Sequence, residues 1–155
     1  MKNNFIPLAK PFVSDDEIAA VTEVIKSGWW TTGPKVVEFE SEISKYIGGS
    51  VSAVALSSAT AGLFLSLRAL GVGPGDEVIV PALTFVASAH VVEWLGAKVV
   101  LCDVDEDTLN IDVNKIEALI TAKTKVIMPV HVGGYPCEMS RVIEIARRRG
   151  LFIVE

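Results

Sequence analysis

The chain has 155 residues, of which 50% are hydrophobic and 21% are charged, and it carries a net charge of −5. This composition is typical of a folded globular protein and excludes a disordered chain. The negative charge removes the attraction to phosphates on which most nucleic-acid affinity depends, so we expect no nucleic-acid partner. Hydroxyl, proline and charged residues interrupt the apolar stretches before the roughly 20 residues that a membrane span needs, so we expect no membrane association.

The amino-terminal residues, the cysteines and the histidines bear on location and on metals. Residues 1–5 lack the apolar region of a secretory signal, which predicts a cytoplasmic protein. The two cysteines, Cys102 and Cys137, lack C-x-x-C spacing, so we expect both to be reduced and buried. The two histidines, His90 and His131, are too few for a catalytic zinc site without further ligands, and we expect no metal.

The first 49 residues are predicted to form a helical segment. Residues 14–17 (Ser-Asp-Asp-Glu) are a capping box, and apolar residues then recur at helical spacing as far as Gly28. Pro34 begins a second amphipathic helix that ends at Gly48 and Gly49. Between the helices, Trp29 and Trp30 are either exposed aromatic residues or part of the core.

From residue 50 onward, predicted strands alternate with predicted helices. We expect strands at residues 50–56, 77–80, 98–101, 125–130 and 151–155, and helices at residues 59–70, 85–95 and 113–120 and from residue 139. This alternation predicts a three-layer α/β fold with a mostly parallel sheet covered on both faces. We therefore divide the chain into a helical segment, 1–49, and an α/β part, 50–155. The last strand has no helix after it, so we expect the chain to be part of a longer protein.

Residues 57–62 (Ser-Ser-Ala-Thr-Ala-Gly) follow a predicted strand and begin a predicted helix. The free N–H groups and the dipole at a helix start bind anions, and small side chains let a phosphate reach the backbone. The segment matches neither G-x-G-x-x-G nor a Walker loop, so those nucleotide sites are not supported. It predicts either a phosphate site or a capped, tightly packed turn.

Three further features follow predicted strands. Phe85 could stack on a planar ring or pack in the core. His131 stands at the strand edge where open α/β sheets bind ligands, so it is a candidate site residue. Asp103, Asp105 and Asp107 imitate the start of a calcium loop but lack its glycine and its bidentate glutamate, which predicts a solvated loop instead.

Several segments together resemble one known family. They are Ser27-Gly28-Trp29 with Thr31-Thr32-Gly33-Pro34-Lys35, Ser57-Ser58-Ala59-Thr60-Ala61-Gly62, Gly73-Pro74-Gly75-Asp76-Glu77-Val78-Ile79 with Pro81 and Thr84-Phe85, and Pro129-Val130-His131 with Gly134 and Pro136. In this order and spacing they resemble the DegT/StrS family of pyridoxal-phosphate (PLP) aminotransferases, which act on keto-sugar nucleotides. Within that family the first two sets are most similar to the enzymes that form UDP-4-amino-4-deoxy-L-arabinose.

The resemblance implies cofactor and substrate sites. It places the PLP phosphate at Ala59, Thr60 and Ala61 and stacks Phe85 on the pyridine ring. It also implies that a second set of residues lies near the substrate or a subunit interface: Trp30, Thr31, Thr32 and His131. The implied fold is the large domain of fold-type I PLP enzymes, usually a homodimer.

The resemblance also implies what the chain lacks. In relatives, an Asp that pairs with the pyridine nitrogen follows the position of Glu155, and the Schiff-base lysine comes later. We therefore expect no catalytic residue in this chain, and we expect it to be inactive alone.

Three interpretations remain open from the sequence. In the first, the intact protein moves an amino group from an amino acid, glutamate, to a keto-sugar nucleotide. In the second, the chain belongs to a non-catalytic regulatory or scaffold member of the same fold. In the third, it is a small-molecule-binding α/β domain of unrelated chemistry.

Overall fold

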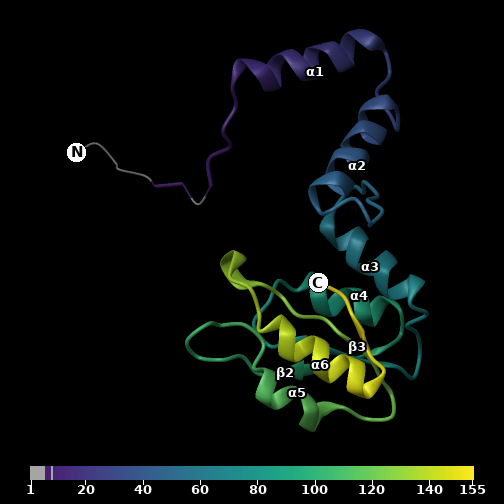
Figure 1. The fold of residues 1–155 in the computed structure, drawn as a ribbon, viewed down its shortest axis with the longest axis vertical. Coiled ribbons are helices and arrows are strands. Elements are labelled where there is room, and N and C mark those ends of the chain that lie inside the picture. Colours follow the sequence, from purple (N-terminus) through teal and green to yellow (C-terminus); the bar gives the residue numbers. More distant parts are fainter. Residues whose placement is uncertain (1–5, 8) are drawn as a thin grey trace. The chain divides into compact units, whose positions relative to one another are not determined.

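The computed structural model describes residues 6, 7 and 9–155 (Figure 1). They divide between Ala55 and Leu56 into two units, of which the first holds the described residues up to Ala55 and the second is Leu56–Glu155. Each unit is described by itself.

The first unit contains two helices at the predicted positions. Helix α1 (Asp15–Ser27) begins with the capping box of Ser14 and Glu17, in which the Glu17 carboxylate accepts the Ser14 N–H at 2.6 Å. It ends at Gly28, whose φ of 71° is the left-handed conformation that glycine adopts without strain. Helix α2 (Pro34–Tyr46) has Pro34 at its first position. Both predicted helices are confirmed.

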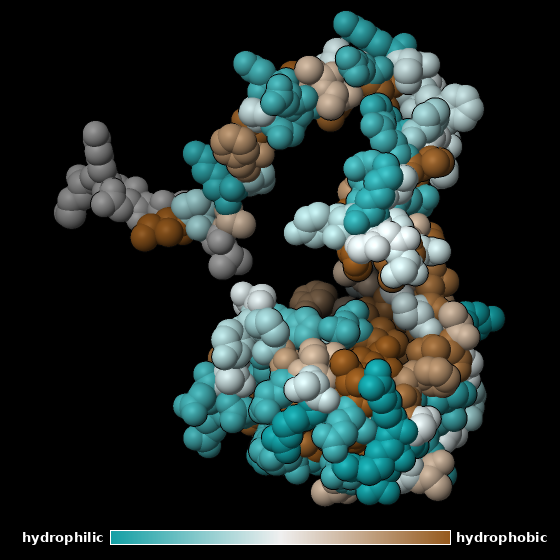
Figure 2. All heavy atoms as spheres, in the orientation of Figure 1, coloured by the Kyte–Doolittle hydropathy of each residue, from teal (hydrophilic) through white to brown (hydrophobic). Residues whose placement is uncertain are grey.

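The apolar residues of α1 and α2 are not covered within this unit. Neither helix buries a residue, and Figure 2 shows brown hydrophobic side chains among the teal ones along their surface. Trp29 and Trp30, between the helices, are 58% and 74% exposed. The suggestion that these tryptophans belong to the core is therefore wrong for this structure.

The strand predicted at residues 50–56 is wrong. The segment forms no strand; its backbone instead bonds to side chains of α2. Ser44 Oγ donates to the Val51 carbonyl at 2.5 Å, and the Ala55 N–H donates to Glu40 Oε1 at 2.8 Å. A strand needs a neighbouring strand to complete its hydrogen bonds, and the described part of the chain places none beside this segment.

The second unit is an α/β sheet structure, and its α/β class is confirmed. Its elements are α3 (Ala59–Ala69), β1 (Glu77–Pro81), α4 (Ala87–Trp94), β2 (Lys98–Cys102), α5 (Val113–Leu119), β3 (Thr124–Ile127), the 3₁₀ turn η1 (Val132–Gly134), α6 (Met139–Arg149) and β4 (Phe152–Ile153). The strands pair in the order β2-β1-β3-β4, and every pairing is parallel.

Some element ends differ from the predicted ones. Helix α4 starts at Ala87 rather than at Phe85, because the residues before it form a tighter turn in which the Ser88 N–H donates to the Phe85 carbonyl at 3.1 Å. Strand β3 ends at Ile127 rather than at residue 130, and Pro129, which has no N–H to donate, lies just beyond it.

Helices cover both faces of the sheet, which confirms the three layers (Figure 1). On one face, Val78 and Val80 of β1 pack with residues of α3 and α4, among them Leu67. On the other face, Ile79 packs with α5 and α6, which contribute Ile116 and others. Successive side chains of β1 therefore pack in the cores on opposite faces of the sheet, because side chains alternate between the two faces along a strand. None of the helices in the described part of the chain has the length and apolar character of a membrane span.

Glu77, the first residue of β1, contacts residues near the amino-terminal ends of β2 and β3. Its carboxylate, which is buried, pairs with Lys98 Nζ of β2 at 2.9 Å and accepts the Thr121 hydroxyl at 2.6 Å. The hydrogen bonds from Thr121 and then Lys98 hold the pKa of the Glu77 carboxyl below its usual range. The ionised form is therefore the one that stabilises the fold.

We predict that Glu77→Gln lowers stability at pH 7 and that the difference from the parent chain shrinks in acid. The folded pKa lies below the unfolded one, so the stabilisation is present above the unfolded pKa of about 4.3 and is lost as the pH falls through the folded pKa. Urea midpoints at pH 7 and in acid measure this difference. The matched control is Glu93→Gln on the exposed surface of α4, and an equal effect of the two substitutions would contradict the prediction.

Both cysteines are free and buried, as the sequence predicted. Cys102 packs in the core beneath α5 and α6, and burial, followed by the charge of Asp112, raises the pKa of its thiol to about 11. Burial also raises the pKa of the Cys137 thiol, which donates to the Val130 carbonyl at 3.2 Å. Neither thiol has the ionised character of a reactive cysteine.

We predict that neither cysteine reacts with a thiol reagent at pH 8 in the folded chain. With a pKa of about 11, only roughly one Cys102 in a thousand is a thiolate at that pH, and the surrounding core excludes the reagent. Absorbance of the released thionitrobenzoate follows the reaction, and both thiols should react in urea. A thiol that reacts within seconds without urea would contradict the prediction.

Candidate functional site

A cavity of about 710 Å³ lies at the carboxyl ends of the parallel strands. Its lining comes from the start of α3, the segment after β1, the segment after β3, and the residue at the end of the chain: Ala59, Thr60, Gly62, Leu63, Ser66, Thr84, Phe85, Ala87, Ser88, Met128, Pro129, Val130, His131 and Glu155. This is the edge at which open α/β sheets bind ligands, and the volume suits a small molecule.

The start of α3 presents free backbone N–H groups to this cavity. The Ser58 hydroxyl accepts the Ala61 N–H at 3.1 Å, and the Ser58 carbonyl accepts the Gly62 N–H at 3.1 Å. The N–H groups of Ala59 and Thr60 precede these bonds and donate to no acceptor in the described part of the chain. Two donors at the positive end of a helix, beside a side chain as small as that of alanine, can bind an anion such as a phosphate.

Phe85 lies on the lining of the same cavity. Its side chain is 76% exposed, so the alternative that it packs in the core is wrong. The segment that carries it is held by a bond of 3.0 Å between the hydroxyls of Thr84 and Ser88, and Ser88 is buried. No motif in the sequence predicted this hydroxyl pair, although the i, i+4 spacing of two hydroxyl residues after a strand could have indicated it.

His131 and Glu155 meet at the same edge. Nε2 of His131 lies 2.8 Å from Glu155 Oε2, and Nδ1 accepts the Cys137 N–H at 3.0 Å. Both side chains line the cavity. Their separation in the chain is 24 residues, which is why the sequence indicated His131 but not its partner.

Buried Asn110 fixes the loop that carries His131. Its Nδ2 donates to the Tyr135 carbonyl at 2.9 Å, and its Oδ1 accepts the Val132 N–H at 2.9 Å. Asn110 is 3% exposed, so water does not compete for these bonds. One amide therefore clamps the loop at two points.

We predict that Asn110→Ala lowers the free energy of unfolding by about 1–3 kcal/mol, because two hydrogen bonds are lost at a buried position. Urea unfolding measures the loss. Asn114→Ala, at an exposed asparagine of α5, is the matched control and should cost less. A cost no greater than that of the control would contradict the clamp.

The remaining predicted site residues do not line this cavity. Ala61 belongs to the same helix start, but its N–H is already bound to the Ser58 hydroxyl. Trp30 and Thr31 line a different cavity, of about 560 Å³, within the first unit. Thr32 lies beside that cavity, where its carbonyl accepts the Trp29 indole N–H at 3.0 Å.

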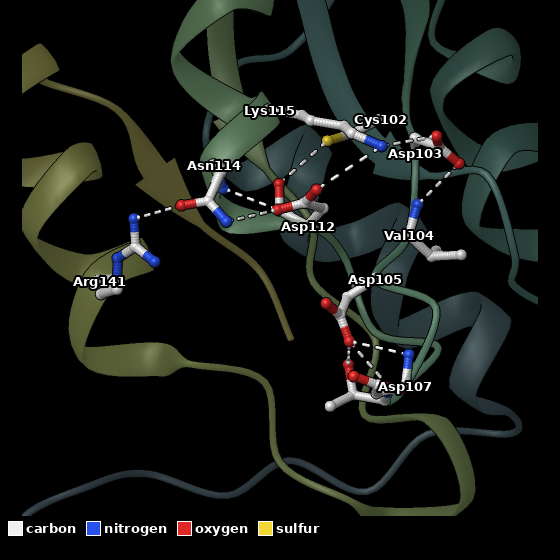
Figure 3. A network of polar contacts seen from close by, with 10 residues as sticks. Cys102, Asp103, Val104, Asp105, Asp107, Asp112, Asn114, Lys115 and Arg141 are labelled. Atoms are coloured by element: carbon white, nitrogen blue, oxygen red, sulfur yellow. Dashed lines mark hydrogen bonds and ion pairs between the residues drawn. The ribbon is translucent and has the colours of Figure 1, made fainter.

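In the acidic loop after β2, the carboxylates of Asp103 and Asp105 pair with nearby groups (Figure 3). Asp103 pairs with Lys115 at 2.8 Å, and this hydrogen bond holds the pKa of the Asp103 carboxyl below its usual range. Asp105 accepts the N–H groups of Asp107 and Thr108. Among the described residues, no group of three or more His, Cys, Asp and Glu side chains is arranged to hold a metal ion.

Comparisons with known proteins identify the family. Residues 11–155 match the family described as the DegT/DnrJ/EryC1/StrS aminotransferase family. The chain belongs to this family. Its relatives include the spore coat polysaccharide biosynthesis protein SpsC of Bacillus subtilis, which is 47% identical over 99% of this chain and 39% of its own length. UDP-4-amino-4-deoxy-L-arabinose–oxoglutarate aminotransferase of Shewanella sediminis is 46% identical over 100% of this chain and 40% of its own length.

Solved structures of family members have the same fold. The aminotransferase TlmJ of Streptoalloteichus hindustanus matches 97% of this chain and 41% of its own with a TM-score of 0.91 and 40% identity. Spr1654 of Streptococcus pneumoniae in its PLP form matches 95% of this chain and 38% of its own with a TM-score of 0.88 and 44% identity. The chain thus spans about 40% of the length of its relatives. The family resemblance and the fold-type expectation are confirmed, and the interpretation as an unrelated small-molecule-binding domain is not supported.

PLP is the cofactor of this family, and the cavity has features that fit it. The free N–H groups of Ala59 and Thr60 suit its phosphate, and the exposed ring of Phe85 suits its planar pyridine ring. Both features line one cavity of sufficient volume.

Proposed function

We propose that residues 56–155 supply the phosphate and ring subsites of the cofactor pocket in a PLP-dependent sugar aminotransferase. One observation carries this proposal: two helix-start N–H groups, which have no acceptor in the described part of the chain, and an exposed aromatic ring line the same cavity. Family membership supports it, and it does not favour a regulatory or scaffold role without chemistry.

The residues of this chain have distinct tasks in the proposed pocket. The N–H groups of Ala59 and Thr60 and the Thr60 hydroxyl donate to the phosphate, which anchors one end of the cofactor. Phe85 covers one face of the ring and excludes water from it. When bound, PLP supplies the electron sink for amino-group transfer. According to the resemblance, none of the lysines in this chain corresponds to the Schiff-base lysine. We therefore propose that Ala59, Thr60 and Phe85 bind the cofactor noncovalently.

The substrates that we propose are a keto-sugar nucleotide and an amino acid, glutamate. The name of the Shewanella relative supports both, since it pairs a UDP-linked amino sugar with oxoglutarate, the keto acid that corresponds to glutamate. From the resemblance we also propose a homodimer in which Trp30, Thr31 and Thr32 lie near the substrate or the subunit interface. Release of oxoglutarate from glutamate on addition of UDP-linked keto sugars tests the reaction in the intact enzyme.

We predict that Thr60→Val weakens PLP binding roughly ten- to hundredfold, because a hydrogen bond to a charged phosphate is worth about 1.5–3 kcal/mol. Fluorescence titration with PLP measures the affinity. Thr22→Val, the same change on the surface of α1, is the control and should have no effect. Unchanged affinity in Thr60→Val would place the phosphate elsewhere.

We predict a similar loss for Ala59→Pro, which removes one backbone donor. Ala59 is the first residue of α3, a position that favours proline, and Ser58 already has the extended backbone that a following proline requires. The helix should therefore persist, as far-ultraviolet circular dichroism can verify. Asp15→Pro makes the same change at the first position of α1 and should leave PLP affinity as it is. Equal affinity in Ala59→Pro and the parent would contradict the helix-start site.

A further inference from the structure

We propose that the Thr84 hydroxyl, oriented by the buried Ser88 hydroxyl, donates a hydrogen bond to a negatively charged oxygen of the ligand in the cavity at the carboxyl ends of the strands. That this ligand is PLP rests on the proposed function. The direction of the hydrogen bond between the two hydroxyls does not depend on it. Thr84 is then a binding residue, and Ser88 is a positioning residue that acts through it.

Both hydroxyl residues line the cavity, close to the end of β1. Thr84 is half-buried, whereas Ser88, the second residue of α4, is only 5% exposed. Their oxygens lie 3.0 Å apart, which is within the range of a hydrogen bond between hydroxyls. The backbone between them is held as well, because the Ser88 N–H donates to the Phe85 carbonyl at 3.1 Å. The pair is thus a fixed feature of the cavity wall.

The number of protons decides the direction of this hydrogen bond. Two hydroxyls have two protons, and the bond between them uses one. In the described part of the chain, neither hydroxyl has a second hydrogen-bond partner. If Thr84 donated, the Ser88 proton would be left unpaired at a buried position, which is costly. Ser88 therefore donates, and Thr84 accepts.

The second proton of the pair then belongs to Thr84 and is available to a ligand. A hydroxyl that already accepts a hydrogen bond is a stronger donor, because hydrogen bonds in a chain polarise one another. Such a donor favours a negatively charged oxygen, to which hydrogen bonds are stronger than to a neutral one. The positive start of α3, on the same cavity, favours the same kind of ligand. PLP has such oxygens on its phosphate and on its ring.

The direction of the bond is tested without any ligand. In an equal mixture of water and heavy water, a hydroxyl that exchanges slowly splits the carbon-13 signal of its Cβ in two. We expect a split signal for Ser88, whose proton is buried and bonded, and a single signal for Thr84. Exposed Ser140, the second residue of α6, is the reference and should show a single signal. Any other pattern for the pair would overturn the proposal, whatever the protein binds.

The binding role of Thr84 is tested with variants that separate its hydroxyl from its packing. Thr84→Val keeps the shape of the side chain but lacks the hydroxyl, and we expect it to lose about tenfold in affinity for PLP. Thr84→Ser keeps the hydroxyl and should retain most of the affinity. Thr22→Val, on the surface of α1, is the matched control. Equal losses in Thr84→Val and Thr84→Ser would show that Thr84 acts only through packing and would overturn its binding role.

The positioning role of Ser88 predicts a smaller loss. Without the Ser88 hydroxyl, the Thr84 hydroxyl rotates among three staggered positions, of which one suits the ligand, so we expect Ser88→Ala to weaken PLP binding about threefold. Ser140→Ala, at the same position of α6, is the matched control and should have no effect. Unchanged affinity in Ser88→Ala would overturn the positioning role.

A double variant separates the direct role of Thr84 from an indirect one. Thr84→Val combined with Ser88→Ala leaves no buried hydroxyl without a partner, and we expect it to lose as much affinity as Thr84→Val alone. Recovery of affinity in the double variant would show that an unpaired Ser88 displaces the turn, and it would overturn the direct role of Thr84.

Comparison of two ligands identifies the oxygen that Thr84 binds. Inorganic phosphate shares only the phosphate group with PLP, and its competition with PLP measures its affinity. Loss of affinity for both in Thr84→Val assigns the hydroxyl to the phosphate, and loss for PLP alone assigns it to an oxygen of the ring. Unchanged affinity for both overturns the binding role alone. If the parent protein does not bind PLP, the proposed function and the binding role fail together, and the carbon-13 signals still decide the direction of the bond.

Discussion

The parallel direction of the strands is the constraint on which the candidate site depends. Parallel strands end at the same edge, so the segments after β1, β3 and β4 converge there although they are far apart in the chain. The start of α3 lies on the same cavity and adds two N–H groups that have no acceptor in the described part of the chain. Free helix-start N–H groups, an aromatic ring and a carboxylate thus line one cavity although none of them is near another in sequence.

Buried polar groups give this edge its shape. Asn110 and Ser88 are buried beneath the loops that carry His131 and Phe85, and each bonds to the loop that it supports. Such bonds are directional and shielded from water, so they select one loop conformation in a way that apolar packing does not. The hydrophobic cores position the sheet, and these few polar contacts position the residues that line the cavity.

The two units differ in how they use apolar residues. In the second unit, β1 is buried on both faces and its residues alternate between two cores. In the first unit, α1 and α2 have the same amphipathic pattern as buried helices, yet they bury no residue. An amphipathic pattern therefore indicates a helix with a face that suits burial, but it does not specify what covers that face.

Local patterns in the sequence determined most of the helices and strands. The capping box at Ser14, proline at the start of α2, and the alternation of strands and helices depend on near neighbours, and the structure has them where they were predicted. The family resemblance likewise depends on motifs that can be read in order along the chain.

Only the tertiary structure decided the features that depend on distant partners. Residues 50–56 have a strand-like composition, but no strand lies beside them in the described chain. Side chains of α2 form hydrogen bonds with their backbone instead. The sequence also did not determine the exposure of Phe85 or the pairing of His131 with Glu155. The physical reason is the same in each case: a hydrogen bond or a buried contact between residues far apart in the chain exists only once the fold has brought them together.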